Sequence, residues 1–221
     1  MKPKELKDFF GQEDIVGEGK LLNRLIKADK LTSAIFWGPP GCGKTSLARI
    51  IANTTKNKFV TLNATTAGVA DIKAVVEKAQ NIFENPTGKV ILFIDDIHRF
   101  NKLQQDALLP HVEKGTVILI GATTENPYFS VNKALISRST VFKFKELEDK
   151  DIVNILKNCI NDKENGLGNY NLEIEDGVLE FLATNSNGDV RSVLNALELA
   201  VLTTNISSNG LSLIHISEPT R

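Results

Sequence analysis

The sequence is poor in cysteine and histidine, and this scarcity excludes several kinds of site. Its 221 residues include two cysteines, Cys42 and Cys159, which are far apart and form no C-x-x-C unit. Their number and spacing argue against a disulfide framework and against a zinc site. The three histidines, His98, His111 and His215, lack the spacing of metal ligands, and we expect them to be surface or ordinary packing residues.

Long hydrophobic runs and an excess of charge of one sign are also missing. No apolar run reaches the roughly 18 residues of a membrane-spanning helix, and the first residues, Met-Lys-Pro-Lys-Glu, contain no apolar signal core. We therefore expect a cytoplasmic protein with no membrane partner. Lys and Arg number 26 against 27 Asp and Glu, so the net charge is −1. This balance predicts no global attraction to nucleic acid, and any DNA contact requires a local patch or several subunits acting together.

The most informative stretch runs from Ile35 to Ala48, where a short apolar segment is followed by a Gly/Pro loop and then by a helix start. Gly38, four further residues and Gly43-Lys44-Thr45 form the phosphate-loop pattern. Glycines allow successive backbone N–H groups to curl around a polyphosphate, and the following helix directs its positive end at the same anion. We expect Lys44 to reach the β- and γ-phosphates of ATP, and the Thr45 hydroxyl to help hold Mg²⁺.

An acidic pair supports this interpretation. Val90–Ile94 is a continuous apolar run typical of a strand buried on both faces, and Asp95-Asp96 follows it directly. In parallel sheets, ligands bind beyond the carboxyl ends of such strands. We expect Asp95 to hold Mg²⁺ through water, and Asp96 to orient the attacking water.

Alternating strand and helix patterns predict a doubly wound α/β fold with a parallel five-stranded sheet. From about residue 147 the pattern becomes helical, so we place an α/β domain at 1–146, a small all-helical domain at 147–205 and a tail at 206–221 that is non-native or disordered. The predicted strands are 35–37, 58–62, 90–94, 117–120 and 141–144, and the predicted helices are 45–52, 69–84, 102–114, 149–160, 175–183 and 189–202. The segment through Asn126-Pro127 is predicted to be a loop.

Five further positions are candidates for the site, each with an ordinary alternative. Ile15 and Val16 precede the first strand and either cover the adenine ring or belong to the core. Thr124, in the loop after the fourth strand, either senses the γ-phosphate or is simply a loop residue. Arg138 is either a surface charge or an arginine finger offered to a neighbouring subunit's nucleotide. Arg191 either reaches the phosphates or is a solvated charge on the first turn of its helix, for which Asp189 is the predicted N-cap.

Taken together, these positions resemble the AAA+ ATPases: the phosphate loop, Asp95-Asp96, Thr124, Arg138 and Arg191 follow the order of Walker A, Walker B, sensor 1, arginine finger and sensor 2. Three stretches resemble the RarA/MgsA family in particular, which includes replication-associated recombination protein A and the Werner-helicase-interacting ATPase. They are Trp37–Thr45, Ile97–Lys102 with Gln104-Gln105-Asp106, and Gly121–Pro127.

This resemblance implies an ATPase with a helical lid that acts as a homo-oligomer. It also implies action on single-stranded DNA or duplex ends near stalled replication forks, with single-strand-binding protein and replisome components as partners. Clamp-loader subunits and Holliday-junction motors share the same core, and a nucleotide-gated binding module with little hydrolysis is the alternative from another class. The predicted nucleotide-binding residues are Ile15, Val16, Gly38, Pro39, Pro40, Gly41, Cys42, Gly43, Lys44, Thr45, Ser46 and Arg191.

The chain departs from the family pattern at two places. The family usually has Asp-Glu where this chain has Asp95-Asp96, and the shorter Asp96 side chain predicts intact ATP binding with slow hydrolysis. Residues 211–221 resemble translated sequencing-adapter read-through, so we expect a truncated gene model and a weakened oligomer.

A separate hypothesis concerns Cys42. Because Cys42 lies next to Lys44 and a helix N-terminus, the pKa of its thiol is expected to be low, and alkylation of the thiol is expected to block ATP binding. The alternative is that Cys42 is an inert small residue.

Overall fold

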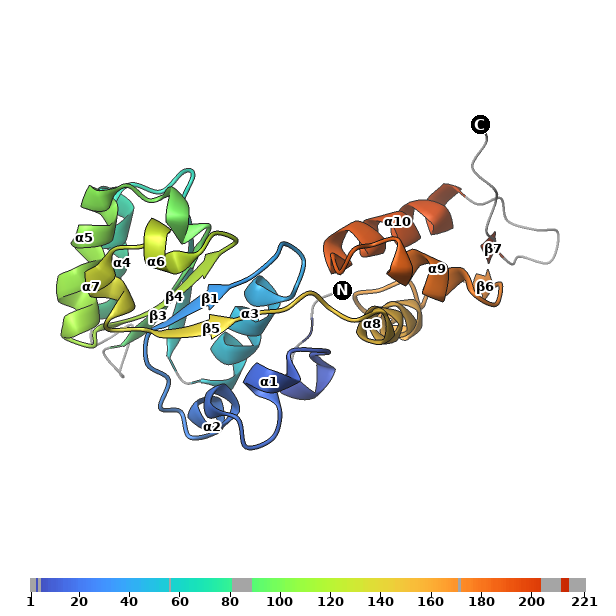
Figure 1. Cartoon of the computed structure of the whole chain (residues 1–221), viewed down its shortest axis with the longest axis horizontal. Coiled ribbons are helices and arrows are strands. Elements are labelled where there is room, and N and C mark those ends of the chain that lie inside the picture. Colours follow the sequence, from blue (N-terminus) through green and yellow to red (C-terminus); the bar gives the residue numbers. More distant parts are fainter. Residues whose placement is uncertain are drawn as a thin grey trace. The chain divides into compact units, whose positions relative to one another are not determined.

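A computed structural model of the chain (Figure 1) describes residues 3, 5–55, 57–80, 89–170, 172–203 and 212–214. The chain divides into a larger unit, which ends at Lys145, and a smaller unit, which begins at Glu146. This division falls one residue before the boundary that the sequence pattern predicts. The two units are described separately below.

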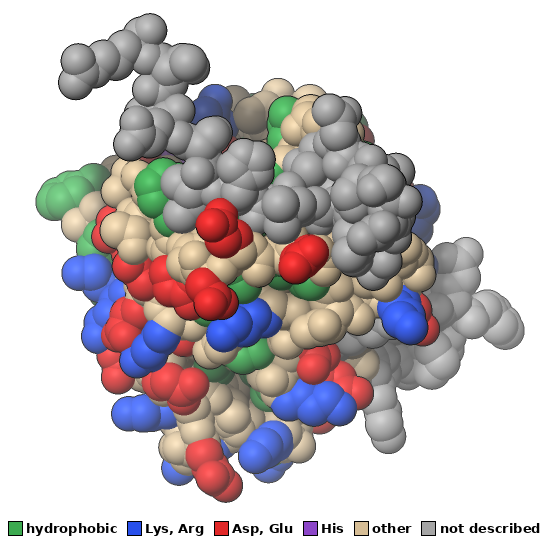
Figure 2. All heavy atoms as spheres, turned by 90° about the vertical axis from the view of Figure 1, so that its right-hand side faces the viewer, with side chains coloured by type: hydrophobic (Ala, Val, Ile, Leu, Met, Phe, Trp, Pro, Cys, Tyr) green, Lys and Arg blue, Asp and Glu red, His purple; other side chains and the backbone are tan. Residues whose placement is uncertain are grey.

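Charged side chains of both signs are interspersed on the face drawn in Figure 2, where lysines and arginines alternate with acidic residues. This mixture is what a chain with a net charge of −1 leads one to expect. Within the described ranges, the helices are too short or too polar to cross a membrane.

The larger unit is built on a sheet of five parallel strands, as predicted. In spatial order the strands are β2 (Lys58–Asn63), β3 (Val90–Asp95), β4 (Val117–Thr123), β1 (Ala34–Trp37) and β5 (Thr140–Lys143). The inner strands β3 and β4 are buried almost throughout, which explains their unbroken apolar sequences. Trp37 of β1 is in register with Thr123 of β4, so these two strands end at the same edge of the sheet.

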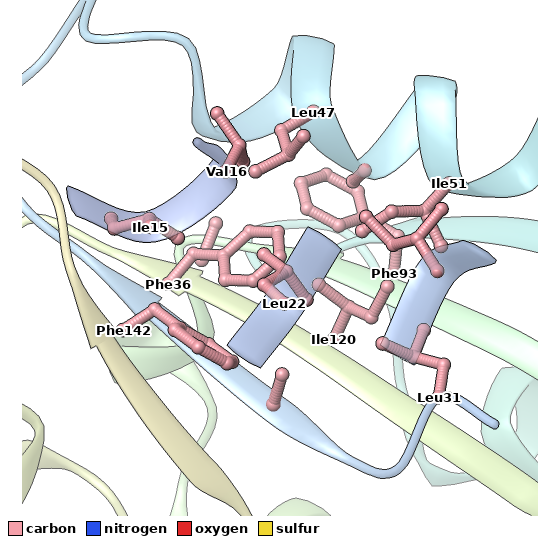
Figure 3. Packing of buried hydrophobic residues seen from close by; sticks show 14 of the residues in the cluster. Ile15, Val16, Leu22, Leu31, Phe36, Leu47, Ile51, Phe93, Ile120 and Phe142 are labelled. Carbon is pink, nitrogen blue, oxygen red and sulfur yellow. The ribbon is translucent and has the colours of Figure 1, made fainter. Parts of the chain in front are cut away.

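One face of the sheet is covered by α1 (Glu13–Val16), α2 (Leu21–Lys27) and α3 (Lys44–Thr54). Their apolar side chains pack against every second residue of the strands, as the close-up in Figure 3 shows. Leu22 and Leu47 lie over Phe36, whose ring makes an edge contact with Phe142. Ahead of α1, the short 3-10 helix η1 (Leu6–Asp8) leads to Phe9, which packs against the same cluster.

The opposite face is covered by α4 (Val69–Gln80), α5 (Lys102–Glu113) and α7 (Lys133–Ile136). The predicted continuation of α4 to residue 84 lies outside the described residues. A short 3-10 helix, η2 (Ile97–Arg99), follows β3.

The prediction of a loop through Asn126-Pro127 is wrong from Pro127 onward, because α6 (Pro127–Ser130) begins there and α7 follows it. Each helix is only four residues long, too short to show a helical repeat. Asn126 and Asn132 cap them: their side chains accept hydrogen bonds from Tyr128 N (3.1 Å) and Ala134 N (2.9 Å).

The smaller unit contains α8 (Asp149–Asn161), α9 (Val178–Thr184) and α10 (Val190–Thr203) around a core that includes Leu156 and Leu197. Helix α9 begins three residues later than predicted, because Gly177 has a left-handed backbone (φ 88°).

The prediction that this unit is all-helical is wrong, because β6 (Leu172–Ile174) and β7 (Ser212–Ile214) pair in parallel. Strands of three residues give too little alternation to be recognised in the sequence. Strand β7 lies in the tail that was predicted to be non-native or disordered, so residues 212–214 are not disordered, while a non-native origin of the tail stays a prediction. The rest of the tail lies outside the described part of the chain.

Candidate nucleotide-binding site

The phosphate loop connects β1 to α3 at the carboxyl edge of the sheet. Gly38 N donates a hydrogen bond to Thr123 O (3.1 Å), which ties the start of the loop to the end of β4. A Cβ atom on Gly38 would lie 2.6 Å from Phe144 O, so this position has no room for a side chain. Gly41 and Gly43 have φ angles of 68° and 99°, in the left-handed region that glycine adopts without strain. The glycines therefore serve the loop shape that the sequence predicts.

Lys44 is the first residue of α3, and it is a buried cation with a relative exposure of 9%. Its Nζ donates hydrogen bonds to Gly38 O (2.8 Å) and to Pro39 O (2.6 Å), and lies 3.7 Å from Cys42 Sγ. A buried charge held by neutral carbonyls is well placed to gain from an anionic partner. Thr45 and Ser46 follow on the first turn of α3 and are half-buried.

The expectation of a reactive Cys42 thiolate is wrong. Cys42 is fully buried in the core cluster, and burial raises the pKa of its thiol, although the neighbouring Lys44 acts in the opposite direction. Desolvation penalises the charged thiolate more than the ammonium group stabilises it. This favours the alternative, in which Cys42 is a small packing residue of the loop.

The acidic pair lies at the end of β3. Asp95, the last residue of this strand, is half-buried and in register with Asn63 of β2. Asp96 leaves the strand in a left-handed conformation with φ 54°, which aspartate tolerates better than most residues. Its Oδ2 lies 3.6 Å from Arg99 Nε, and its backbone oxygen accepts a hydrogen bond from Arg99 N (2.8 Å).

The end of β4 carries a buried hydroxyl that the sequence interpretation missed. Thr123 is 1% exposed, and its Oγ1 lies 3.0 Å from His98 Nδ1 and accepts a hydrogen bond from Glu125 N (3.0 Å). The predicted sensor, Thr124, is the next residue and is exposed. His98 was expected to be an ordinary packing or surface residue. The sequence feature that could have indicated a role for His98 is its position two residues after Asp95-Asp96.

Ile15 and Val16 lie on α1 and are buried within the cluster of Figure 3. This is the core role that the sequence left open beside an adenine contact. Both residues therefore contribute to the cover of the sheet, while a contact with adenine stays a prediction.

Arg138 precedes β5, which is parallel to β1 and in register with it from Ala34↔Thr140 onward. It therefore lies near the amino ends of these strands, whereas the phosphate loop follows the carboxyl end of β1. Its guanidinium donates to Ala134 O (2.9 Å) and forms an ion pair with Glu113 Oε1 (2.7 Å). The structure does not bring Arg138 to the loop of its own chain.

Arg191 lies on the first turn of α10 in the smaller unit. Asp189 caps this helix as predicted, because its Oδ1 accepts a hydrogen bond from Arg191 N (2.9 Å). The role of the Arg191 side chain stays a prediction.

The donor set suits a hard cation better than a transition metal. Among the described residues, no three His, Cys, Asp or Glu side chains gather in a cluster that could hold a metal by themselves. Mg²⁺ is commonly held by one or two protein oxygens together with substrate phosphates and water. Thr45 and Asp95 fit that pattern.

Comparison with known proteins agrees with this geometry. Residues 34–147 match the ATPase family associated with various cellular activities (AAA). Replication-associated recombination protein A of Haemophilus influenzae is 46% identical over 211 residues, covering 95% of this chain and 47% of the relative. ATPase WRNIP1 of Dictyostelium discoideum is 43% identical over 201 residues, covering 91% of this chain and 23% of the relative.

The structure of the Thermotoga maritima RuvB Holliday junction branch migration motor is also similar, with a TM-score of 0.76 and 26% identity. The match covers 97% of this chain and 69% of that one. The predicted resemblance to the RarA/MgsA family is thus confirmed. The chain spans 47% of the length of the Haemophilus relative and 23% of the length of the Dictyostelium relative. A phosphate loop at the edge of a five-stranded parallel sheet and the match over residues 34–147 lead to the same conclusion: the chain belongs to the AAA family of ATPases.

Proposed function

We propose that the larger unit binds ATP with Mg²⁺ and hydrolyses it. The observation that carries this proposal is the meeting of three groups at one edge of the sheet: the buried Lys44 ammonium, the Asp95-Asp96 pair, and the hydroxyl-bearing end of β4. Their order on adjacent parallel strands is the arrangement in which α/β sheets bind phosphates.

In this proposal each group has a distinct task. The backbone N–H groups from Gly41 to Ser46 surround the phosphates, and Lys44 exchanges its loop carbonyls for phosphate oxygens. Thr45 and Asp95 hold the magnesium ion, which neutralises charge on the phosphates when bound. Asp96 orients water, and Thr124 contacts the γ-phosphate.

Arg138 is proposed to act on the nucleotide of a neighbouring subunit. The support is its place near the amino end of β5, at the other end of the sheet from the loop of its own chain. An arginine offered in trans stabilises the charge that develops on the transferred phosphoryl group. On this proposal, the Glu113 ion pair holds the guanidinium when no neighbour is present.

A subunit-mixing assay tests this assignment. Lys44→Ala subunits keep Arg138 but lose their own nucleotide, whereas Arg138→Ala subunits keep their nucleotide but lose the donated arginine. Each variant alone should be inactive, and a mixture should regain part of the wild-type turnover. If mixtures never exceed the sum of the two single variants, Arg138 does not act in trans.

The proposed biological setting is replication-fork maintenance, recombination and repair in the cytoplasm, acting on single-stranded DNA or duplex ends together with single-strand-binding protein. The names of the relatives support the link to DNA replication and recombination. Arg191 is proposed to report on the nucleotide from the smaller unit. The near-zero net charge and the mixed charges in Figure 2 suggest that DNA binding depends on an assembly of several subunits.

A second candidate is a nucleotide-gated binding module, and the observation that favours it is Asp96. A carboxylate one methylene shorter than the usual glutamate is also drawn towards Arg99, at 3.6 Å. A Holliday-junction motor is supported by the likeness to the Thermotoga protein, but at lower identity than the recombination relatives.

The deciding experiment measures ATP retention and phosphate release on a version of full family length, without DNA and with single-stranded, forked and blunt DNA. DNA-stimulated release that disappears in Lys44→Ala supports the enzyme. Tight Mg²⁺-dependent binding with negligible release on every DNA supports the binding module. Failure to retain ATP at all would overturn both.

A further inference from the structure

His98 and Thr123 form a buried polar link between two strand ends at the proposed site. His98 lies on η2, directly after β3, and its side chain is 10% exposed. Its Nδ1 lies 3.0 Å from Thr123 Oγ1 at the end of β4. The link therefore joins the chain that leaves β3 to the chain that leaves β4.

The same hydroxyl also shapes the turn that follows β4. Thr123 Oγ1 accepts a hydrogen bond from Glu125 N (3.0 Å) and lies 3.3 Å from Glu125 O. On its other side, His98 Nε2 lies 3.9 Å from the Glu125 carboxylate. The imidazole thus contacts both ends of a three-residue turn, and Thr124 is the residue in the middle.

The link lies next to the two residues that are proposed to act on the γ-phosphate end of ATP. Asp96 lies two residues before His98, and Thr124 lies one residue after Thr123. Strands β3 and β4 are paired up to Ile94 and Gly121, so beyond that point the backbone ladder no longer fixes their spacing. The His98–Thr123 contact continues the connection where the ladder ends.

We propose that His98 is a positioning residue for ATP hydrolysis, which holds the backbone at Thr124 and the backbone at Asp96 at a fixed separation. The inference rests on the proposed function of the site. It assigns His98 no contact with the nucleotide. Its removal should therefore affect kcat and leave ATP affinity almost unchanged.

The size of the effect follows from how strongly catalysis depends on placement. A misplacement of about 1 Å can reduce a rate on the order of 10²-fold. Loss of the imidazole frees the turn around Thr124, but Thr123 Oγ1 keeps its Glu125 backbone partners, so the fold should survive. We expect kcat to fall by about 10- to 100-fold in His98→Leu, with the Kd for ATP changed by less than about 3-fold.

Four variants separate positioning from packing. His98→Leu fills a similar volume without hydrogen bonds, and His98→Asn places an amide near the former Nδ1. Thr123→Val removes the partner hydroxyl at constant shape. His111→Leu is the matched control on α5, because it removes a histidine whose Nδ1 has no hydrogen-bond partner in the structure.

Steady-state phosphate release and binding of a fluorescent ATP analogue are measured on each variant and on the His98→Leu/Thr123→Val double variant. We expect His98→Asn to retain more of the wild-type kcat than His98→Leu. The double variant should be no slower than the slower single variant, because both changes break the same link. His111→Leu should match wild type.

Three outcomes overturn the inference: an unchanged kcat in His98→Leu, a loss that appears only in ATP affinity, or fully additive losses in the double variant. If His98→Leu does not fold, the same comparison is made with His98→Asn and Thr123→Val, and wild-type kcat in both overturns it equally. If wild type itself binds ATP but releases no phosphate, the proposed hydrolysis fails and the positioning role fails with it. That result is distinguishable from failure of the positioning role alone, in which wild type releases phosphate and the His98 variants release it equally fast.

Discussion

Replacing Asp96 with glutamate should accelerate ATP hydrolysis. Asp96 follows the last residue of β3, and its carboxylate is proposed to orient the attacking water. Glutamate extends this carboxylate by one methylene towards the position that the family pattern favours. Asp95 stays in place, so the metal and the nucleotide should bind as before.

The expected gain in kcat depends on the placement of the carboxylate, while backbone strain at residue 96 lowers folding stability. Correcting a displacement of about 1 Å can restore on the order of 10²-fold in rate. Asp96 has φ 54°, however, and glutamate is less well suited to this left-handed conformation, at a cost of about 1 kcal/mol in folding stability. The ion pair with Arg99 is half-exposed, so its change should matter by less than about 1 kcal/mol. We therefore expect kcat to be higher by about 10- to 100-fold and the fold to be slightly less stable.

The assay is phosphate release at saturating ATP and Mg²⁺, with ATP affinity and urea unfolding measured on the same preparations. Asp29→Glu is the matched control: Asp29 also has a left-handed backbone (φ 50°), but it lies before β1, at the other end of the strand from the phosphate loop. Asp29→Glu should lose similar stability and gain no activity. An Asp96→Glu enzyme that binds ATP normally and turns over no faster than wild type would refute the reasoning.

Three other variants test the loop. Lys44→Ala should weaken ATP binding on the order of 10- to 100-fold without unfolding the chain, as measured by retention of labelled ATP, because it removes a charged hydrogen-bond donor. Gly38→Ala brings a Cβ to 2.6 Å from Phe144 O and should cost about 1–3 kcal/mol in urea unfolding, whereas Gly68→Ala, with its nearest neighbour at 3.8 Å, should cost less; equal losses would contradict this. Because burial raises the pKa of the Cys42 thiol in the folded state, the unfolded chain ionises first, and this thiol should make stability fall as pH rises above the ordinary thiol pKa. Urea unfolding between about pH 7 and about pH 10 should show a smaller fall in Cys42→Ala, and an identical pH dependence would refute the assignment.

The sheet and the phosphate loop could be predicted because their sequence signals are local and redundant. The apolar run Val90–Ile94 is long enough to require burial on both faces, and it became an inner strand. Gly41 and Gly43 are required by the left-handed backbone of the loop, and Gly38 is required because Phe144 O leaves no room for a side chain. Such features do not depend on distant partners.

The remaining features depend on tertiary contacts that no local pattern encodes. The raised pKa of Cys42 results from burial in the core cluster that also contains residues of α1 and α2, whereas the sequence shows only the neighbouring lysine. The link between His98 and Thr123 joins residues 25 positions apart, which become neighbours only when β3 pairs with β4. The short helices α6 and α7 are fixed by asparagine caps and packing, since four residues cannot establish a helical repeat.

The cover that α1 and α2 provide has a practical consequence for recombinant work on this chain. A fragment cut to the stretch matched by the family, residues 34–147, would lack the side chains that lie over Phe36 and Phe142. It would expose a large hydrophobic surface to water, and we expect it to aggregate. An expression boundary should therefore be set ahead of Leu6, whose side chain packs against the same cluster.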